Sequence, residues 1–264
     1  MINQRKYSRK YIGQEFKSKD SLGGYTFRVI DGGTKVGYAL CEIVEEPRFN
    51  ASEFRICHLK DGAMENSYRA TVCDIGYIGQ GKHIKSVRGK DTKQYKVWWH
   101  MIHRVYSKKY PTYKKVKVCE EWHNFQVFAE WFEKQKESGL YQDGWQLDKD
   151  LFSDRENKIY SPSTCVFLPP RVNSFFTNKK ISNTSGYIGV SYNKGYKKYQ
   201  SQISFLYEET QKTKYKHLGF FDTKKEALNV YKEARKLEVK KLIDIYKDIL
   251  ADKIINRIED IEGV

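Results

Sequence analysis

Residues 145–173 constrain the fold of this chain more than any other segment. The segment begins with an extended run that ends in the triplet Asp148-Lys149-Asp150, in which two acids flank one lysine, and a polar loop follows. Ser161 before Pro162 predicts a capped helical turn, because Ser caps free amides and Pro suits the first helical position. An apolar, strand-like run then leads to Asn173. Two short strands joined by a polar loop and a helical turn are therefore expected here.

The acidic triplet places two carboxylates on one side of a strand. Side chains alternate along a strand, so Asp148 and Asp150 share a face. With the hydroxyl of Thr164 on the following turn, they offer the oxygen ligands that a hard divalent cation prefers. Asn157 is expected to hold the loop through side-chain hydrogen bonds. Two acids at a strand end are also common in solvated turns, and the spacing alone leaves that structural role open.

The net charge limits the kinds of partner. The 264 residues include 48 Lys and Arg against 33 Asp and Glu, a formal net charge of +15. So large an excess indicates a polyanion partner, and nucleic acid is preferred to an anionic membrane surface. No apolar run approaches the ~20 residues of a membrane span, and the N-terminus lacks the apolar core of a signal peptide. A cytoplasmic protein without membrane contact is therefore expected.

The pattern along the chain predicts a modular α+β fold. Short alternating runs in residues 1–90 predict a small N-terminal β module, to which the sequence assigns no chemistry. Its strands are expected at 25–30, followed by a turn at 31–33, and at 36–43 and 54–58. Residues 91–178 form the second expected domain and residues 183–264 the third, with a basic linker over 179–186. The five cysteines are scattered without a Cys-x-x-Cys pair, and reduced core residues are expected.

Helical periodicity replaces the strand pattern in the second domain. Asp91 can cap a first helix, and a further helix is expected over 124–139. Residues 91–117 carry eight Lys or Arg against one acid, which favours phosphate contact over solvation alone. Lys114 and Lys115 are the expected DNA-binding residues of this stretch.

Three strands and a capped helix are expected in the third domain. The strands are expected at 187–192, 198–207 and 215–221. Thr223 and Glu226 form a capping box at the start of the helix that follows. The predicted arrangement is a three-stranded sheet packed on one amphipathic helix. A last helix over 239–258 either caps this domain or pairs with another chain, so both a monomer and a homodimer remain open.

Residues 91–178 resemble phage-encoded HNH homing endonucleases, whose nuclease core is a ββα-metal motif. The likeness rests most on Leu147-Asp-Lys-Asp150 and on the tail Thr164-Cys-Val-Phe-Leu-Pro-Pro-Arg-Val-Asn173. The run Val118-Cys-Glu-Glu-Trp-His-Asn-Phe125 adds to it, and Gly76-Tyr-Ile-Gly-Gln-Gly81 fits more weakly the region before such a core. The resemblance implies metal-assisted hydrolysis of DNA with Mg²⁺ or Mn²⁺. The implied catalytic residues are Asp148, Lys149, Asn157 and Asn173, and the implied metal ligands are Asp148, Asp150 and Thr164.

Two positions depart from the common motif. Lys149 stands where a general-base His is usual, and a protonated lysine cannot accept a proton unless burial or a nearby cation favours its neutral form. Lys149 could equally hold the phosphate while water loses its proton to solvent. Thr164 replaces the usual Asn ligand with a weaker oxygen donor. A slow or inactive nuclease is therefore the alternative.

Histidines outside the motif are rival candidates for chemistry. His123 could act as a base, but a structural or DNA-contacting role is preferred. His100 and His103 lie one helical turn apart, as metal ligands do, yet packing amid Trp98 and Trp99 is the favoured interpretation.

Residues 185–237 resemble the plant ethylene-response-factor DNA-binding domain. The likeness is carried by Gly186-Tyr-Ile-Gly-Val-Ser-Tyr192, Tyr199-Gln-Ser-Gln-Ile203 and His217-Leu-Gly-Phe-Phe-Asp-Thr-Lys-Lys-Glu-Ala227. The resemblance implies that the sheet lies in the major groove of double-stranded DNA. The implied DNA-facing residues are Ser191, Lys194, Lys198, Tyr199, Gln202 and Ser204. The plant domain usually has Arg and Trp at several of these positions, so its base preference does not carry over.

The sequence thus predicts a DNA endonuclease of the HNH homing type, acting in the host cytoplasm if it is phage-encoded. The rival prediction is a DNA-binding protein, a repressor or an accessory factor, with a decayed nuclease centre. A third and less favoured prediction is an RNA-binding protein that uses Tyr-rich basic faces.

Overall fold

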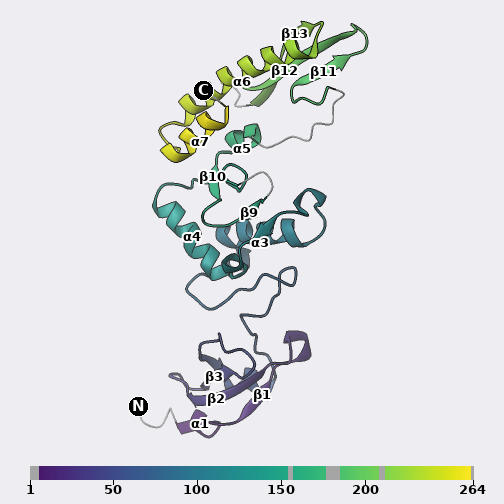
Figure 1. The fold of residues 1–264 in the computed structure, drawn as a ribbon. Coiled ribbons are helices and arrows are strands. Elements are labelled where there is room, and N and C mark those ends of the chain that lie inside the picture. Colours follow the sequence, from purple (N-terminus) through teal and green to yellow (C-terminus); the bar gives the residue numbers. More distant parts are fainter. Residues whose placement is uncertain (1–5, 154–156, 177–184, 208–211, 263–264) are drawn as a thin grey trace. The chain divides into compact units, whose positions relative to one another are not determined.

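The computed structural model describes residues 6–153, 157–176, 185–207 and 212–262. It confirms a mixed α+β architecture of small sheets and separate helices (Figure 1). The chain divides into two compact units, one of residues 1–134 with 159–161 and the other of residues 135–158 with 162–264. The three-domain division expected from the sequence stays a prediction. Among the helices of the described ranges, none combines the length and the apolar character needed to cross a membrane.

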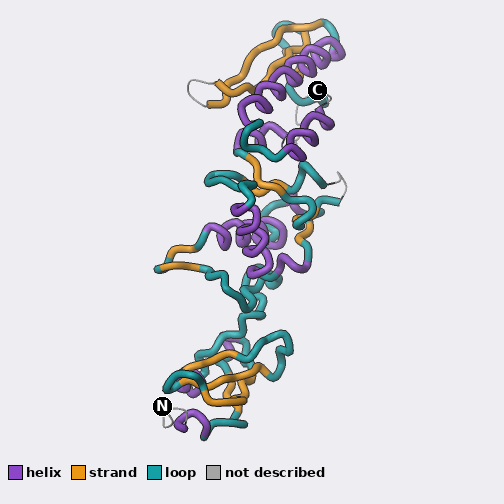
Figure 2. The backbone as a smooth tube through the Cα atoms, turned by 90° about the vertical axis from the view of Figure 1, so that its left-hand side faces the viewer, coloured by secondary structure: helices purple, strands orange, loops and turns teal. Residues whose placement is uncertain are grey.

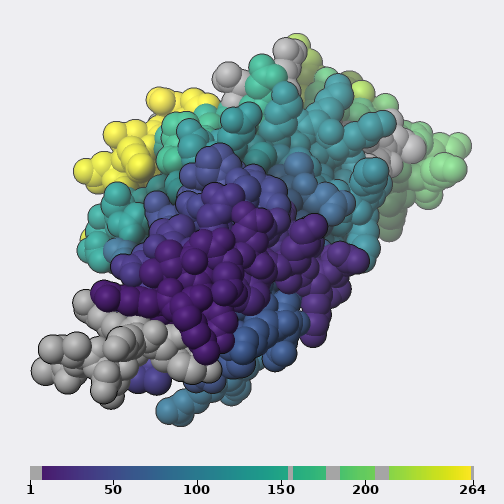
Figure 3. Space-filling view, turned by 90° about the horizontal axis from the view of Figure 1, so that it is seen from below, coloured from purple at the N-terminus to yellow at the C-terminus, as the bar shows by residue number. Residues whose placement is uncertain are grey.

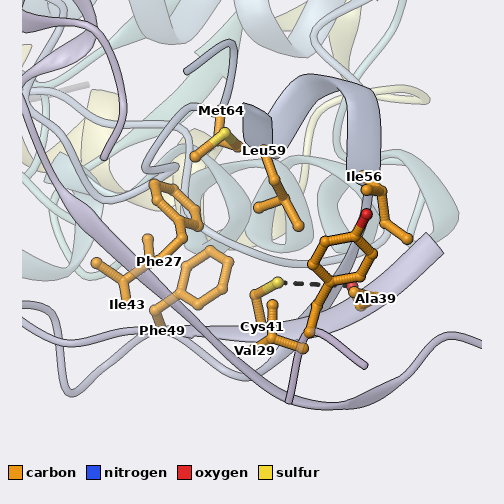
Figure 4. Packing of buried hydrophobic residues seen from close by; sticks show 10 residues of the cluster. Phe27, Val29, Ala39, Cys41, Ile43, Phe49, Ile56, Leu59 and Met64 are labelled. Atoms are coloured by element: carbon orange, nitrogen blue, oxygen red, sulfur yellow. Dashed lines mark hydrogen bonds between the residues drawn. The ribbon is translucent and has the colours of Figure 1, made fainter. Parts of the chain in front are cut away.

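The N-terminal module is an antiparallel sheet whose strands follow the order of the chain. Its elements are α1 (Lys6–Arg9), β1 (Glu15–Lys17), β2 (Thr26–Gly32), β3 (Tyr38–Ile43), β4 (Ser52–Arg55) and α2 (Ile56–Lys60). Phe27 and Val29 of β2 and Ala39 and Cys41 of β3 are almost fully buried, as alternation requires for a sheet with one face on a core. Figure 4 shows these side chains converging with Leu59 of α2. Figure 3 shows the surface of the N-terminal residues in purple.

Two expectations for this module are wrong. The strand expected over 54–58 ends early, because Ile56 and Leu59 are buried at helical spacing in α2. The strand before the expected Asp-Gly-Gly turn does not stop there either. A bulge after Val29 carries β2 on to Gly32, and the chain reverses only beyond that residue.

An aromatic core joins the helices that follow. The elements are β5 (Ser86–Val87), β6 (Lys90–Asp91), α3 (Lys93–Tyr106), β7 (Lys117–Val118), α4 (Phe125–Glu137) and β9 (Ile159–Tyr160). Trp98 and Trp122 are fully buried, and Trp98 Nε1 donates to the Trp122 carbonyl at 2.8 Å. Phe125 and Phe128 of α4 are fully buried beside them. Strand β9 pairs with β7 in parallel, so a residue pair from far along the chain completes this unit.

The start of α3 lies one residue later than expected. Thr92 caps the helix, because its hydroxyl accepts a hydrogen bond from the Tyr95 amide at 3.4 Å. Asp91 instead pairs with Ser86 in the β5–β6 hairpin. The second expected helix is confirmed as α4.

A short hairpin followed by a helix lies in the second unit. Strand β8 (Gln146–Asp148) pairs antiparallel with β10 (Val166–Leu168). Helix α5 (Pro170–Phe176) follows β10 at once (Figure 1). The helical turn expected after Ser161 is wrong, because the three residues that follow form a non-helical turn. The helix of this region begins at Pro170, where proline again suits the first turn.

The C-terminal part is a three-stranded antiparallel sheet with a long helix beside it (Figure 2). The elements are β11 (Val190–Asn193), β12 (Lys198–Tyr207), β13 (Lys212–Phe221), α6 (Lys224–Tyr246) and α7 (Asp252–Glu262). Ala227 and Tyr231 of α6 pack on Val190 and Ile203 of the sheet. Gly189 is required where the sheet meets the helix, since a Cβ at this residue would clash with the Tyr231 ring.

The helix boundaries of this part are confirmed at one end and corrected at the other. The capping box of Thr223 and Glu226 forms as expected. The single helix expected over 239–258 is wrong, because α6 stops at Tyr246 and α7 starts at Asp252. The break lets α7 bury apolar residues on its own inner face. Most of the expected linker, residues 179–184, lies outside the described residues.

Candidate functional site

In the second unit, β8, its antiparallel partner β10 and α5 follow in the order strand, strand, helix, and β9 of the first unit lies in the connection between the two strands. Asp148 ends β8 and lies opposite Val166 of β10. Asn173 of α5 reaches back to the start of β8, where its Nδ2 donates to Gln146 Oε1 at 2.7 Å. The helix is therefore tied to the strand whose far end carries the acidic triplet.

Asp148 is a buried carboxylate, with 9% of its surface exposed. Its Oδ2 accepts hydrogen bonds from the backbone amides of Asp150 at 2.9 Å and Leu151 at 2.8 Å. Burial raises the pKa of Asp148, and the hydrogen bond from Leu151 opposes that rise without cancelling it. A cation bound beside this carboxylate would therefore favour its ionised form.

Asp150 lies between two lysines. Lys149 Nζ donates to its Oδ2 at 2.9 Å, and Lys158 Nζ donates to its Oδ1. Burial acts to raise the pKa of Asp150, but the hydrogen bonds from Lys158 and Lys149 outweigh burial and lower it. The side chain of Lys149 is only 6% exposed, and its Nζ contacts Asp150 in this ion pair. A lysine ammonium donates hydrogen bonds and accepts none.

The remaining predicted residues of the motif lie around this acidic end. Thr164 is partly buried in the turn that leads into β10, at the end of the hairpin that also carries Asp148. Asn157 is exposed and makes no hydrogen bond to any described residue, so the expected pinning of the loop by this side chain is not seen. Within the described ranges, no group of three or more His, Cys, Asp and Glu residues comes together as a metal cluster.

Sequence reasoning missed three residues of this site. Lys158 lies eight residues beyond Asp150, and no periodic signal marks it as a partner. Gln146 has no distinguishing feature in the sequence, because its hydrogen bond with Asn173 depends on how α5 packs against β8. Arg171 of the same helix forms an ion pair with Glu238 of α6 at 3.3 Å, with each side chain 9% exposed. This buried pair fixes α5 in the second unit.

The sheet of the C-terminal part has one covered and one uncovered face. Val190 and Ile203 face α6, so by alternation Ser191, Gln202 and Ser204 face the opposite way. Gln202 is exposed and Ser191 and Ser204 are partly buried.

Two lysines flank this uncovered face. Lys198 lies on the same side of the sheet and pairs with Asp222 at 3.1 Å, and Lys194 is exposed in the turn before it. Tyr199 differs from the prediction, because it packs against the core on the covered face.

The third strand contributes side chains to the same face that the sequence did not suggest. Gln202 lies opposite His217, Ser204 lies opposite Tyr215, and Phe220 lies further along β13. A bulge between Ser201 and Gln202 shifts the register of β13, so simple alternation does not predict which of its residues face outward. Tyr215 is 66% exposed and Phe220 is 39% exposed.

The other candidates belong to the first unit. Lys114 and Lys115 are both exposed, as phosphate contact requires. His123 Nε2 lies 3.3 Å from Tyr106 Oη, and burial lowers the pKa of His123, which agrees with a packed rather than a catalytic histidine. The ring of His103 stacks on Trp99 with centroids 4.5 Å apart, which fits the packing interpretation for this helix.

Compared with protein-family models, with curated proteins and with solved structures, the chain gives no match. Two groups of residues in the second unit carry the candidate functional side chains. One is the acidic end of β8, and the other is the uncovered face of the sheet β11–β12–β13.

Proposed function

We propose that this chain is a metal-dependent DNA endonuclease of the HNH type, which hydrolyses phosphodiester bonds of double-stranded DNA. The observation that carries the proposal is the acidic end of β8. There a buried carboxylate, Asp148, adjoins a second carboxylate and two lysines in a hairpin that is followed by a helix. The large positive charge of the chain supports a polyanionic substrate.

A single Mg²⁺ or Mn²⁺ suits the donors at this end of the hairpin. Asp148 supplies the charged oxygen, and its raised pKa is the mark of a buried carboxylate that a cation would stabilise. Thr164 supplies a neutral oxygen, and Asp150 is a further carboxylate once its lysines release it. Such an ion, when bound, stabilises the charge that develops on the scissile phosphate and on its leaving oxygen.

The lysines act on the phosphate rather than on water. Lys149 and Lys158 hold Asp150 in the absence of DNA, and a phosphate oxygen of the substrate can replace that carboxylate as their acceptor. Their positive charge then stabilises the negative charge that develops on the phosphate as water attacks phosphorus. The attacking water loses its proton to solvent, and the bond from phosphorus to the leaving oxygen breaks.

The uncovered face of the C-terminal sheet is the proposed duplex-binding surface. Lys194 and Lys198 contact phosphates and position the sheet without reading sequence. Gln202 is exposed among them and carries an amide that can pair with a base edge in the major groove. Cutting and recognition are thus assigned to separate residues of one unit.

A second candidate is a DNA-binding protein whose nuclease centre has decayed. It is favoured by one observation: both oxygens of Asp150 are occupied by lysines, and Oδ2 of Asp148 is occupied by backbone amides. Such a centre holds a cation only weakly if these contacts never open.

Incubation with supercoiled plasmid distinguishes the two candidates. The proposed function predicts nicked or linear product with Mg²⁺ or Mn²⁺, and none with a chelator. Plasmid that stays supercoiled with either metal, while a gel shift shows binding, would establish the second candidate instead.

A further inference from the structure

A hollow of about 440 Å³ lies beside the first turns of α3, within the range of roughly 300–1,000 Å³ that is typical of ligand pockets. It is lined by Lys85, Asp91, Tyr95, Lys96, Trp99 and His100. The residues come from the β5–β6 hairpin and from one side of α3. The lining therefore combines aromatic rings with two lysines and only one acid.

Aromatic rings continue from this hollow along α3 and into the segment that follows its end at Tyr106. Trp99 stacks on His103 with an interplanar angle of 15°, and the His103 ring meets the edge of Tyr110 at 6.1 Å. Tyr110 is 44% exposed, and its ring lies next to that of Tyr113. These aromatic residues, named here the α3 ladder, are Trp99, His103, Tyr110 and Tyr113.

The surroundings of the α3 ladder are strongly basic. Residues 91–117 carry eight Lys or Arg against one acid. Lys96, Lys108 and Lys109 are exposed, and Arg104 lies over the Tyr113 ring at 5.9 Å. Lys96 lines the hollow together with Trp99, and Lys109 precedes Tyr110 in the chain, so a polyanion bound by these cations would lie close to the aromatic rings.

We infer that the α3 ladder binds a single-stranded segment of DNA, with an unpaired base in the hollow at Trp99. Bases of a duplex are stacked on one another, so only a base that has left the stack can lie against Trp99 in a recess. Aromatic stacking with cations along the backbone is the general way in which proteins bind single strands. The inference goes beyond the proposed function and does not depend on cleavage.

Fluorescence anisotropy of the full chain with a short labelled oligothymidylate tests the inference. Trp99→Leu keeps an apolar side chain but removes the ring, and it should weaken binding by about 5- to 150-fold, as expected from roughly 1–3 kcal/mol per stacked base. Lys96→Gln, at the hollow, should weaken binding more than Lys93→Gln, which makes the same charge change one helical turn earlier and outside the lining. Thermal melting shows whether each variant is folded.

A second readout follows the tryptophans directly. The oligothymidylate should quench part of the intrinsic fluorescence in the wild type, and this part should be missing in Trp99→Leu. Trp98, Trp122 and Trp145 are buried, and the partly exposed Trp131 packs against Trp122, away from the lining of the hollow. Equal affinity of the wild type and a folded Trp99→Leu variant for the oligothymidylate would overturn the inference. So would equal competition by a duplex of the same length. Plasmid cleavage reports separately on the proposed function.

Discussion

Replacement of Asp148 by asparagine separates the charge of this side chain from its hydrogen bonds. The asparagine oxygen can still accept from the amides of Asp150 and Leu151, but the charge that burial penalises is gone. Because burial raises the pKa of Asp148, the ionised carboxylate is less stable in the folded protein than in water. We expect Asp148→Asn to melt at or above the wild-type temperature when no divalent metal is added.

Asp148→Ala is the matched comparison, because it removes the acceptor altogether. Two backbone amides then lose their partner, at roughly 1–3 kcal/mol each. Water can reach a site that is 9% exposed, so the lower end applies, about 2 kcal/mol for the pair. At about 2–4 °C per kcal/mol, the melting temperature should fall by about 4–8 °C.

The pH dependence has a definite sign. A raised carboxyl pKa means that the penalty on the folded state is present above that pKa and is relieved as the pH falls through it. The stability difference between Asp148→Asn and the wild type should therefore be largest near neutral pH and shrink in acid. Melting curves of both proteins across this range measure it.

Added Mg²⁺ should reverse the order, since a ligand that binds only the folded state stabilises it. Mg²⁺ should raise the melting temperature of the wild type and leave that of Asp148→Asn unchanged. Plasmid cleavage by Asp148→Asn should fall by orders of magnitude while a gel shift shows normal binding. Cutting at the wild-type rate would refute the metal assignment, and melting as low as Asp148→Ala would refute the argument from burial.

Substitutions at four further positions test other parts of the second unit. Lys149→Met should slow plasmid cleavage by roughly 10²-fold or more, because one cation that faces the phosphate is lost; full activity in Lys149→His would instead identify a base at this position. Arg171→Ala should lower the free energy of unfolding in urea titration, by up to about 3–5 kcal/mol, because the buried carboxylate of Glu238 loses the guanidinium that faces it. An unchanged midpoint would show the pair to be unimportant. Lys198→Ala should weaken binding to all duplexes alike and reduce by about one the slope of log affinity against log salt concentration. Gln202→Ala should instead relax the preference at one base pair, by about 1–3 kcal/mol. Anisotropy titrations with a panel of duplexes measure both effects, and a sequence-dependent loss in Lys198→Ala would contradict these roles.

Local signals in the sequence predict much of the fold. The capping box at Thr223 needs only residues within one helical turn, so the start of α6 could be predicted. The end of α6 could not, because residues 247–251 contain no Gly or Pro to mark it. The break there depends on where α7 buries Ile254 and Ile258, which is tertiary information.

The candidate site likewise contains residues that local signals in the sequence predict and residues that they do not. Asp148 and Asp150 stand out because alternation and charge are local properties of a strand. Lys158 does not, because its contact with Asp150 depends on the path of the chain between them. The outward face of β13 depends on a bulge, which the pattern of polar and apolar residues does not reveal.

The parallel pairing of β9 with β7 has a consequence for synthesis on the ribosome. Residues 159–161 complete the first unit, although the residues on both sides of them belong to the second. The first unit therefore cannot finish folding when residue 134 leaves the ribosome. The backbone groups of Lys117 and Val118 that pair with β9 stay without these partners until β9 is synthesised. The two units are interleaved along the chain, so no single recombination point can exchange one of them intact for a module from another gene.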